Sequence, residues 1–177
     1  MPLNSAESLP APVARVTELL RSEEFIRRVS EATGGSLDSF TLTGDPEGAF
    51  ELGITRSFPT SELSELVQKF AGARLSIQQN ETWAAPGADE SREVSIHASV
   101  SGAPVEIVAT QRLLPDTASA ASADSATQSA TRVEVAGTVS CSIPFLGERI
   151  AAAAEPALTE ALRLQISEAR KTLEDIA

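Results

Sequence analysis

The stretch AFELGITRSF, residues 49 to 58, alternates apolar and polar side chains, with Phe50, Leu52 and Ile54 separated by Glu51, Gly53 and Thr55. Successive side chains of a β-strand point to opposite faces, so this pattern predicts a strand with one buried and one wet face. Phe40 and Leu42 continue the alternation upstream, and the Gly- and Pro-containing segment 44–48 between the two runs predicts a hairpin. The chain is therefore expected to contain a one-faced antiparallel sheet.

Four later segments repeat this alternation, at residues 74–83, 92–101, 104–114 and 131–143, and a short first strand is expected near residues 3–8. Together they predict a curved antiparallel sheet of about six or seven strands. Residues 115–130 consist almost entirely of Ala, Ser, Thr, Asp and Gln, which is typical of a flexible loop. A linker between domains is the alternative, but the flanking strands need each other's edges, which favours a loop inside a single domain spanning residues 1–177.

Two short helices are expected between the first strand and the hairpin. Apolar residues recur at helical spacing from Val13 to Leu20, directly after Pro12. Ser22 then precedes two acidic residues, which is typical of a helix N-cap, and Gly34 ends this second helix. A further helix is expected near residues 61–70, where apolar side chains recur at i, i+3, i+4 and i+7.

The C-terminal region, from about residue 147 to residue 176, predicts a long helix of roughly 45 Å at 1.5 Å per residue. Pro156 lies inside this pattern, so either the helix kinks there or a second helix begins there. A sheet that is apolar on one face must bury that face, and this is the one long amphipathic segment that can cover it. We therefore predict an α+β fold in which the sheet wraps the helix, with a cavity at one end that Leu158 and Leu162 help to line.

Several polar residues keep the inward parity of these strands: Arg56, Gln79, Glu81 and Gln111, with Trp83 next to them. Burying an unpaired charge costs several kcal/mol. Either Arg56 and Glu81 pair, or they line a wet pocket that also meets the polar end of a ligand. The alternative is a β-bulge or a fraying strand end that turns each side chain outward.

Charge and composition exclude several classes of function. The chain has 14 Lys and Arg against 25 Asp and Glu, a net charge of -11, which repels nucleic acids and anionic membrane surfaces. The N-terminus has no signal-peptide pattern, and no apolar run approaches the roughly 18 residues of a membrane span. We expect a cytoplasmic protein without membrane insertion and without nucleic-acid partners.

The sequence contains none of the common catalytic or metal-binding motifs. Cys141 is the only cysteine and His97 the only histidine, and His97 has the outward parity of Ser95 and Ser99. We interpret His97 as a surface residue and Cys141 as an inert thiol on the apolar face. Without a phosphate-cradling loop or paired metal-ligand spacing, we expect no cofactor, no metal and no catalytic residue.

The order of elements resembles the START-like or helix-grip superfamily, which includes polyketide cyclases and lipid-transfer domains. Four segments are similar to those of an uncharacterised bacterial family assigned to that superfamily: LPAPVARV at 9–16, ETW at 81–83, SGAPV at 101–105 and SIPFLGERI at 142–150. The similarity spans nearly the whole chain. It implies a hydrophobic pocket between sheet and terminal helix, and it places the helix near 61–70 where lids occur in related folds, with Leu66 and Phe70 as candidate gate residues.

Three functions are compatible with this interpretation. The first is noncatalytic binding or carriage of a small apolar or aromatic ligand, with Arg56, Gln79, Glu81, Trp83, Gln111, Leu66, Phe70, Leu158 and Leu162 as ligand-binding residues. The second is a cyclase or dehydratase acting on a polyketide-like substrate, with Glu81 as acid or base and with Arg56 and Gln79 orienting an oxygen. The third is a protein-interaction module, which the polar outward face of the sheet disfavours.

Overall fold

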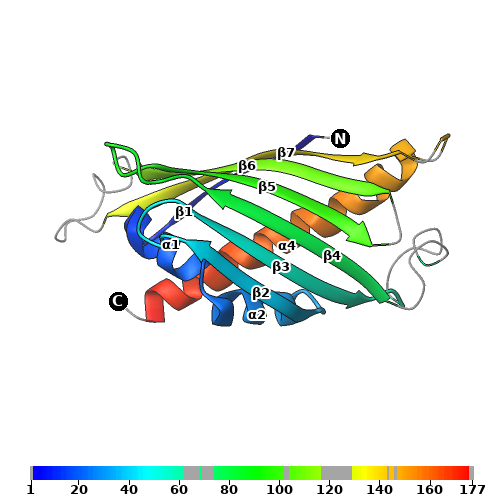
Figure 1. Cartoon of the computed structure of the whole chain (residues 1–177), viewed down its shortest axis with the longest axis horizontal. Helices are drawn as coiled ribbons and strands as arrows, with labels where there is room; N and C mark the ends of the chain where they lie inside the picture. The colour runs from blue at the N-terminus through cyan, green and yellow to red at the C-terminus, as the bar shows by residue number, and fades with distance from the viewer. Residues whose placement is uncertain are drawn as a thin grey trace.

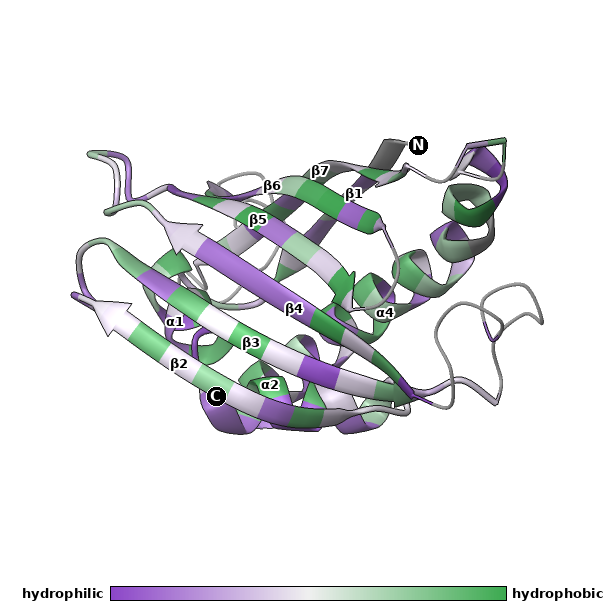
Figure 2. Cartoon of the chain, turned by 45° about the vertical axis from the view of Figure 1, so that its right-hand side comes forward, coloured by the Kyte–Doolittle hydropathy of each residue, from purple (hydrophilic) through white to green (hydrophobic). Residues whose placement is uncertain are grey.

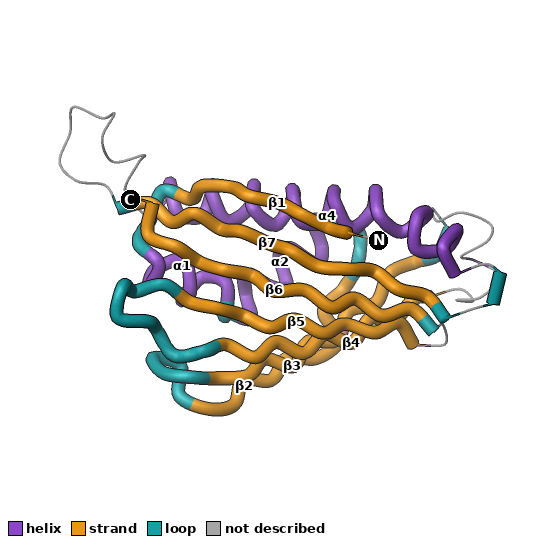
Figure 3. Tube along the Cα trace, turned by 90° about the horizontal axis from the view of Figure 1, so that it is seen from above, coloured by secondary structure: helices purple, strands orange, loops and turns teal. Residues whose placement is uncertain are grey.

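A computed structural model of the 177-residue chain describes residues 2–61, 68, 74–101, 104–116, 129–142, 144–145 and 147–175. Within these residues, seven strands form one antiparallel sheet in the order β1-β7-β6-β5-β4-β3-β2, and three helices lie on one side of it (Figures 1 and 3). The strands are β1 Pro2–Leu9, β2 Ser36–Gly44, β3 Phe50–Pro59, β4 Arg74–Trp83, β5 Arg92–Ser101, β6 Val105–Asp116 and β7 Ala130–Cys141. The helices are α1 Val13–Leu20, α2 Glu23–Ala32 and α4 Gly147–Asp175.

The sheet bends around α4, as the α+β prediction requires (Figure 1). Inward residues of the hairpin strand β3 are almost fully buried, with Phe50, Leu52 and Ile54 exposed by 2%, 1% and 2%. Their neighbours Glu51 and Thr55 keep the opposite, more exposed face. In Figure 2 this alternation is visible along β3, whereas β4 is hydrophilic through its middle, where residues 78–81 are Gln, Gln, Asn and Glu. Polar side chains therefore enter the inner face from β4.

The strands at the predicted loop run further than expected. Pro115 pairs with Thr131 and Asp116 with Ala130, so the ends of the expected 115–130 loop belong to β6 and β7. Strand β5 ends its pairing with β6 opposite Leu113, so Pro115 has no neighbour on that side and its missing N–H is tolerated. Residues 117–128 lie outside the described ranges.

Local signals for the helices are confirmed. The hydroxyl of Ser22 accepts a hydrogen bond from the backbone N–H of Phe25 at 3.4 Å and caps α2, whose first turn carries two glutamates. Helix α4 is a single helix that continues through Pro156, whose side chain is exposed, so no second helix begins there. The expected helix near 61–70, with Leu66 and Phe70, falls almost entirely outside the described residues. None of the helices in the described ranges has the length and apolar character needed to cross a membrane.

Two apolar clusters hold α4 against the sheet, one near each end of the helix. Ala169 and Leu173 pack with α1, α2 and the inner face of the sheet, while Ile150 and Ala151 pack with the opposite ends of β6 and β7. The middle of α4, residues 158–165, is buried only in part or exposed. This division of the core leaves space between the two clusters, under the middle of the sheet.

Candidate functional site

A cavity of about 160 Å³ lies between the middle of α4, the end of α2 and the inner face of strands β3 to β7. Most of its wall is apolar, formed by Val29, Phe58, Ile77, Ile96, Ala98, Ile107, Ala109, Val135, Leu158, Ala161 and Leu162. Its polar side chains are Thr33, Arg56, Gln79, Glu81, Gln111 and Gln165. The site thus combines an apolar wall with one group of hydrogen-bonding residues.

A chain of hydrogen bonds joins the polar residues of α2, β3 and β4. Arg56 donates from Nε to the hydroxyl of Ser30 at 3.0 Å and from Nη1 to Oε1 of Gln79 at 2.8 Å. The amide nitrogen of Gln79 donates to Oε1 of Glu81, and Trp83 Nε1 donates to Oε2 of Glu81 at 2.8 Å. The Arg56 and Glu81 charges are therefore connected through Gln79, and not by the direct ion pair considered from the sequence.

Strand register explains why these side chains meet. Gln79 lies opposite Ile54 and Arg56 opposite Ile77 in the β3–β4 pairing, which makes Arg56 and Gln79 diagonal neighbours on one face. Diagonal pairs are within reach when both side chains are long. The β3–β4 register runs without a shift; the irregularity found in this hairpin lies between Leu37 and Ser39, in the β2–β3 pairing. The bulge alternative is therefore wrong for Arg56, Gln79 and Glu81, which keep the inward parity.

Burial changes the acid–base properties of the two charged residues. Loss of solvation raises the pKa of Glu81 above that of an ordinary glutamate, and hydrogen bonds from Trp83 and Gln79 and the charge of Arg56 offset this only in part. The pKa of Arg56 is lowered by the same loss of solvation, with Glu81 acting in the opposite sense. Burial thus shifts Glu81 toward its protonated form, which is able to donate a hydrogen bond.

Most of the residues predicted from the sequence border the cavity. Arg56, Gln79, Glu81 and Gln111 do so, as do Leu158 and Leu162 on α4. Leu66 and Phe70 lie outside the described residues.

Trp83 is placed differently from the expectation. It is 1% exposed, stacks on Phe50 with ring centroids 5.0 Å apart, and borders a separate space of about 20 Å³, room for one water-sized molecule. Arg56, Glu81 and Gln111 border this small space as well as the cavity. Trp83 therefore contacts Glu81 from the side of the small space and does not line the cavity.

Sequence reasoning missed Ser30, Thr33 and Gln165. Gln165 follows Leu158, Ala161 and Leu162 at i+7, i+4 and i+3, so the apolar stripe of α4 itself contained the signal. Ser30 is fully buried and donates a hydrogen bond to the carbonyl of Ile26, one turn earlier in the same helix, at 2.7 Å. The helical pattern of the sequence does not indicate that Ser30 also contacts Arg56 on strand β3.

The two residues interpreted as non-catalytic lie apart from this site. His97 is exposed on the outer face of β5, as its parity predicts. Cys141 is a free, half-buried thiol that packs against the apolar cluster of Val105, Val139, Ile150 and Ala151. Neither residue borders the cavity.

Comparison with known proteins places the chain in a family. Residues 5–173 match the family described as "Protein of unknown function (DUF2505)". No protein with a curated description matches the chain in sequence.

Solved structures share the architecture at low sequence identity. The protein TTHA0849 from Thermus thermophilus is 12% identical with a TM-score of 0.60, covering 100% of this chain and 99% of that chain. A START superfamily protein from Mycobacterium smegmatis is 11% identical (TM-score 0.52; 97% and 98% covered). Truncated norcoclaurine synthase from Thalictrum flavum is 12% identical (TM-score 0.52; 98% and 92% covered). These similarities confirm the START-like, helix-grip fold.

Proposed function

The chain belongs to the DUF2505 family, and we propose that it binds a small aromatic or otherwise apolar molecule carrying one polar oxygen, without chemically changing it. The observation that carries this proposal is the cavity of about 160 Å³, whose wall is apolar except for the residues around Arg56, Gln79 and Glu81. Ligand sites of small molecules combine these two features, a mostly apolar wall and a few placed polar groups.

Size restricts the ligand. An apolar cavity of about 150 Å³ accepts benzene. A cavity of about 160 Å³ therefore suits a single substituted ring or a short branched chain, and it is too small for a long acyl chain.

The polar group restricts the ligand further. Arg56 and the amide nitrogens of Gln111 and Gln165 are hydrogen-bond donors, and burial favours the protonated form of Glu81, which is a further donor. A hydroxyl or carbonyl oxygen on the ligand is a suitable acceptor. A carboxylate on the ligand would raise the cost of burying charge beside Glu81. We therefore favour a neutral ligand such as a phenol.

A matched pair of probes tests this function. Toluene and p-cresol differ by one hydroxyl, and we expect both to bind by isothermal titration, with p-cresol tighter by about tenfold because a buried hydrogen bond contributes about 0.5–1.5 kcal/mol. Failure of both probes to bind would refute the proposal. Equal affinity for the two probes would show that the polar residues around Arg56, Gln79 and Glu81 do not bind the hydroxyl.

Two substitutions on α4 locate the binding. Ala161 lines the cavity, so Ala161→Leu places three additional carbons inside it and is expected to abolish binding of both probes. Ala157 is exposed on the same helix, so Ala157→Leu is the matched control and leaves binding unchanged. Equal loss in both variants would place the probes elsewhere.

The raised pKa of Glu81 favours one second candidate, an enzyme of the cyclase or dehydratase type in which Glu81 acts as a general acid. Both carboxyl oxygens already accept hydrogen bonds from the protein, which favours binding over proton transfer. Turnover of an enolisable aromatic ketone, lost in Glu81→Gln, would support the enzyme.

An interaction module has less support. Among the described residues, Val108 and Phe145 are the exposed large apolar side chains, which are too few for an apolar docking patch. A cytoplasmic location stays part of the proposal, because the one cysteine of the sequence, Cys141, cannot form a disulfide within the chain.

A further inference from the structure

A second cleft, of about 610 Å³, lies at the end of the sheet where α1 meets the β2–β3 turn and the β4–β5 loop. Its charged lining consists of three arginines and three glutamates, Arg15, Arg21, Arg92, Glu18, Glu47 and Glu90, and Thr17 lies among them. We propose that this cleft binds the oxyanion group, a carboxylate or a phosphate, of a small anionic molecule. This site is separate from the cavity described above and does not depend on the function proposed for it.

Two of the three arginines of the cleft are largely buried, whereas the Arg15 side chain is 42% exposed. Arg92 is only 6% exposed and the side chain of Arg21 18% exposed, and both guanidinium groups lie over the ring of Phe50, at 5.4 and 5.9 Å from its centroid. Two like charges held beside one ring repel each other. Burial and the charge of Arg21 lower the pKa of Arg92, and Glu47 and Asp45 offset this only in part. An anion between them would relieve this repulsion.

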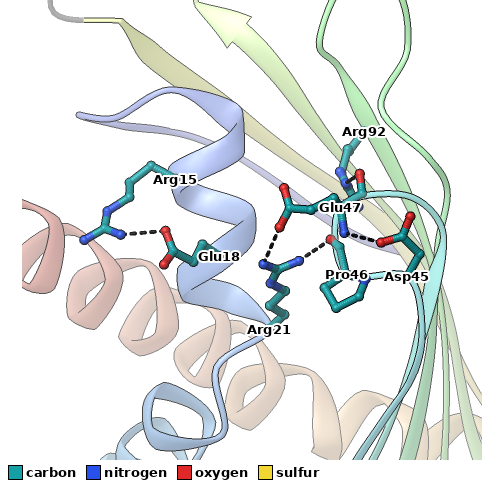
Figure 4. Close-up of polar contacts among 7 residues, drawn as sticks. All are labelled: Arg15, Glu18, Arg21, Asp45, Pro46, Glu47 and Arg92. Carbon is teal, nitrogen blue, oxygen red and sulfur yellow. Dashed lines mark hydrogen bonds and ion pairs between the residues drawn. The ribbon is translucent and has the colours of Figure 1, made fainter.

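The three glutamates of the cleft, Glu18, Glu47 and Glu90, are exposed. Glu47 pairs with Arg21 at 2.8 Å but its side chain is 85% exposed, and Glu18, which pairs with Arg15, is 57% exposed (Figure 4). Exposed ion pairs of this kind contribute little to stability. A ligand oxyanion can therefore replace the Glu47 carboxylate on Arg21 at low cost.

Hydrogen bonding in the cleft is incomplete. Arg92 donates from Nη2 to the backbone carbonyl of Glu47 at 2.9 Å, and Arg21 donates to the carbonyl of Pro46, so both arginines hold the turn through backbone oxygens (Figure 4). In the described part of the chain, two buried side-chain polar atoms have no hydrogen-bond partner, Nη1 of Arg92 and Oγ1 of Thr17. Both residues line this one cleft.

Unsatisfied buried donors are rare in folded proteins and call for a specific reason. Guanidinium groups bind carboxylate and phosphate through paired N–H donors, which is the geometry that Arg21 and Arg92 together can offer. An oxyanion that takes the place of the Glu47 carboxylate would supply an acceptor to Arg21. It would also reach Nη1 of Arg92 and the hydroxyl of Thr17 once these two buried groups turn toward the cleft. The competing explanation is that both arginines serve only to anchor the turn.

Titration with inorganic phosphate and with acetate tests the site, and it separates the two oxyanion classes. Binding is followed by isothermal titration and by the emission of Trp83, the only tryptophan, which stacks on Phe50 beneath the two arginines. Chloride at equal ionic strength is the reference. We expect at least one oxyanion to bind where chloride does not; if neither does, the proposal fails.

Two substitutions with opposite expected effects distinguish a binding site from an anchor. Arg21→Met is expected to weaken oxyanion binding at least about tenfold, because it removes a charged donor. Glu47→Gln removes the competing carboxylate and is expected to tighten binding by about threefold or more. An anchoring role alone predicts that both substitutions lower the melting temperature and that neither changes anion affinity, and this result would overturn the proposal.

Matched controls complete the test. Arg27 on α2 is an exposed arginine paired with Glu23, and Arg27→Met should leave oxyanion affinity unchanged. Ala161→Leu fills the separate cavity and should also leave it unchanged. Loss of binding in either control would show that the oxyanion does not occupy the Arg21–Arg92 cleft.

Discussion

The indole N–H of Trp83 donates a hydrogen bond of 2.8 Å to the carboxyl group of Glu81, two residues earlier on strand β4. Residues two apart on a strand face the same side, so the pair is a direct product of the strand period. Trp83 is the only tryptophan in the chain. Its fluorescence therefore reports on Glu81, the carboxyl group of the candidate site, whose pKa is raised by burial.

Trp83 emission is expected to titrate with Glu81. Because the pKa of Glu81 is raised, the transition should fall above the ordinary glutamate value of about 4.3. Glu81→Gln should abolish the transition, whereas Glu51→Gln, at an exposed carboxylate of neighbouring β3, should leave it in place. A transition that persists in Glu81→Gln would assign it to another group.

Glu81 should also make stability depend on pH. A raised pKa in the folded state means that the folded protein holds the proton more tightly than the unfolded chain. The contribution of Glu81 is therefore fully present below about pH 4.3 and is lost as the pH rises through the raised pKa. Urea unfolding from pH 5 to pH 8 should show the free energy of unfolding of the wild type falling relative to Glu81→Gln. A constant difference would contradict the raised pKa. The pKa of Asp89 is also shifted, since hydrogen bonds from Ser91 lower it. Asp89 is present in both proteins, so its contribution to the pH dependence of stability cancels in the difference.

Arg56→Met should lower the free energy of unfolding substantially only when Glu81 is ionised. At low pH the substitution removes a buried charge and its hydrogen bonds to Ser30 and Gln79, two opposing effects that nearly cancel. Above the raised pKa of Glu81, the substitution also leaves a buried carboxylate without the nearby charge of Arg56, and we expect a loss of about 3 kcal/mol. Urea unfolding at one pH below and one pH above the Trp83 transition measures this.

The same substitution in the Glu81→Gln background should cost equally at both pH values, because the titrating group is gone. Arg163→Met, at an exposed arginine of α4, should change stability by less than about 0.5 kcal/mol. A pH-independent cost of Arg56→Met in the wild type would show that Gln79 does not couple the two charges.

Gly137→Ala should weaken the β6–β7 pairing beside the cavity. A Cβ at this position would lie 2.6 Å from Cβ of Ala109 and 2.8 Å from the carbonyl oxygen of Val108, and backbone atoms cannot move aside without shifting a strand. We expect a loss of about 1–3 kcal/mol in urea unfolding.

Gly53→Ala is the matched control for that substitution. Its Cβ would meet the hydroxyl of Thr41 at 2.6 Å, and this hydroxyl can rotate away. Alanine also loses less backbone freedom than glycine on folding, so the control should be neutral or stabilising. If Gly137→Ala and Gly53→Ala lowered the free energy of unfolding equally, the close approach of strands β6 and β7 would not be the cause.

Much of the fold followed from periodicity alone. Alternation along β3 to β7 assigned Leu52, Val94, Leu113 and Val133 to one buried face, and the same counting brought Arg56, Gln79 and Glu81 onto that face. Periodicity is a local property, set by the two-residue repeat of a strand and the 3.6-residue turn of a helix, so it can be read from neighbours in the chain.

Tertiary structure decided everything that depends on distances between elements. Register placed Gln79 between Arg56 and Glu81, the stacking partner Phe50 held Trp83 away from the cavity, and α2 supplied Ser30. The cleft of Arg21 and Arg92 joins a helix end to a strand 71 positions later. A one-dimensional pattern specifies the face on which a side chain lies, whereas its partner on another element is set by the packing of the whole core.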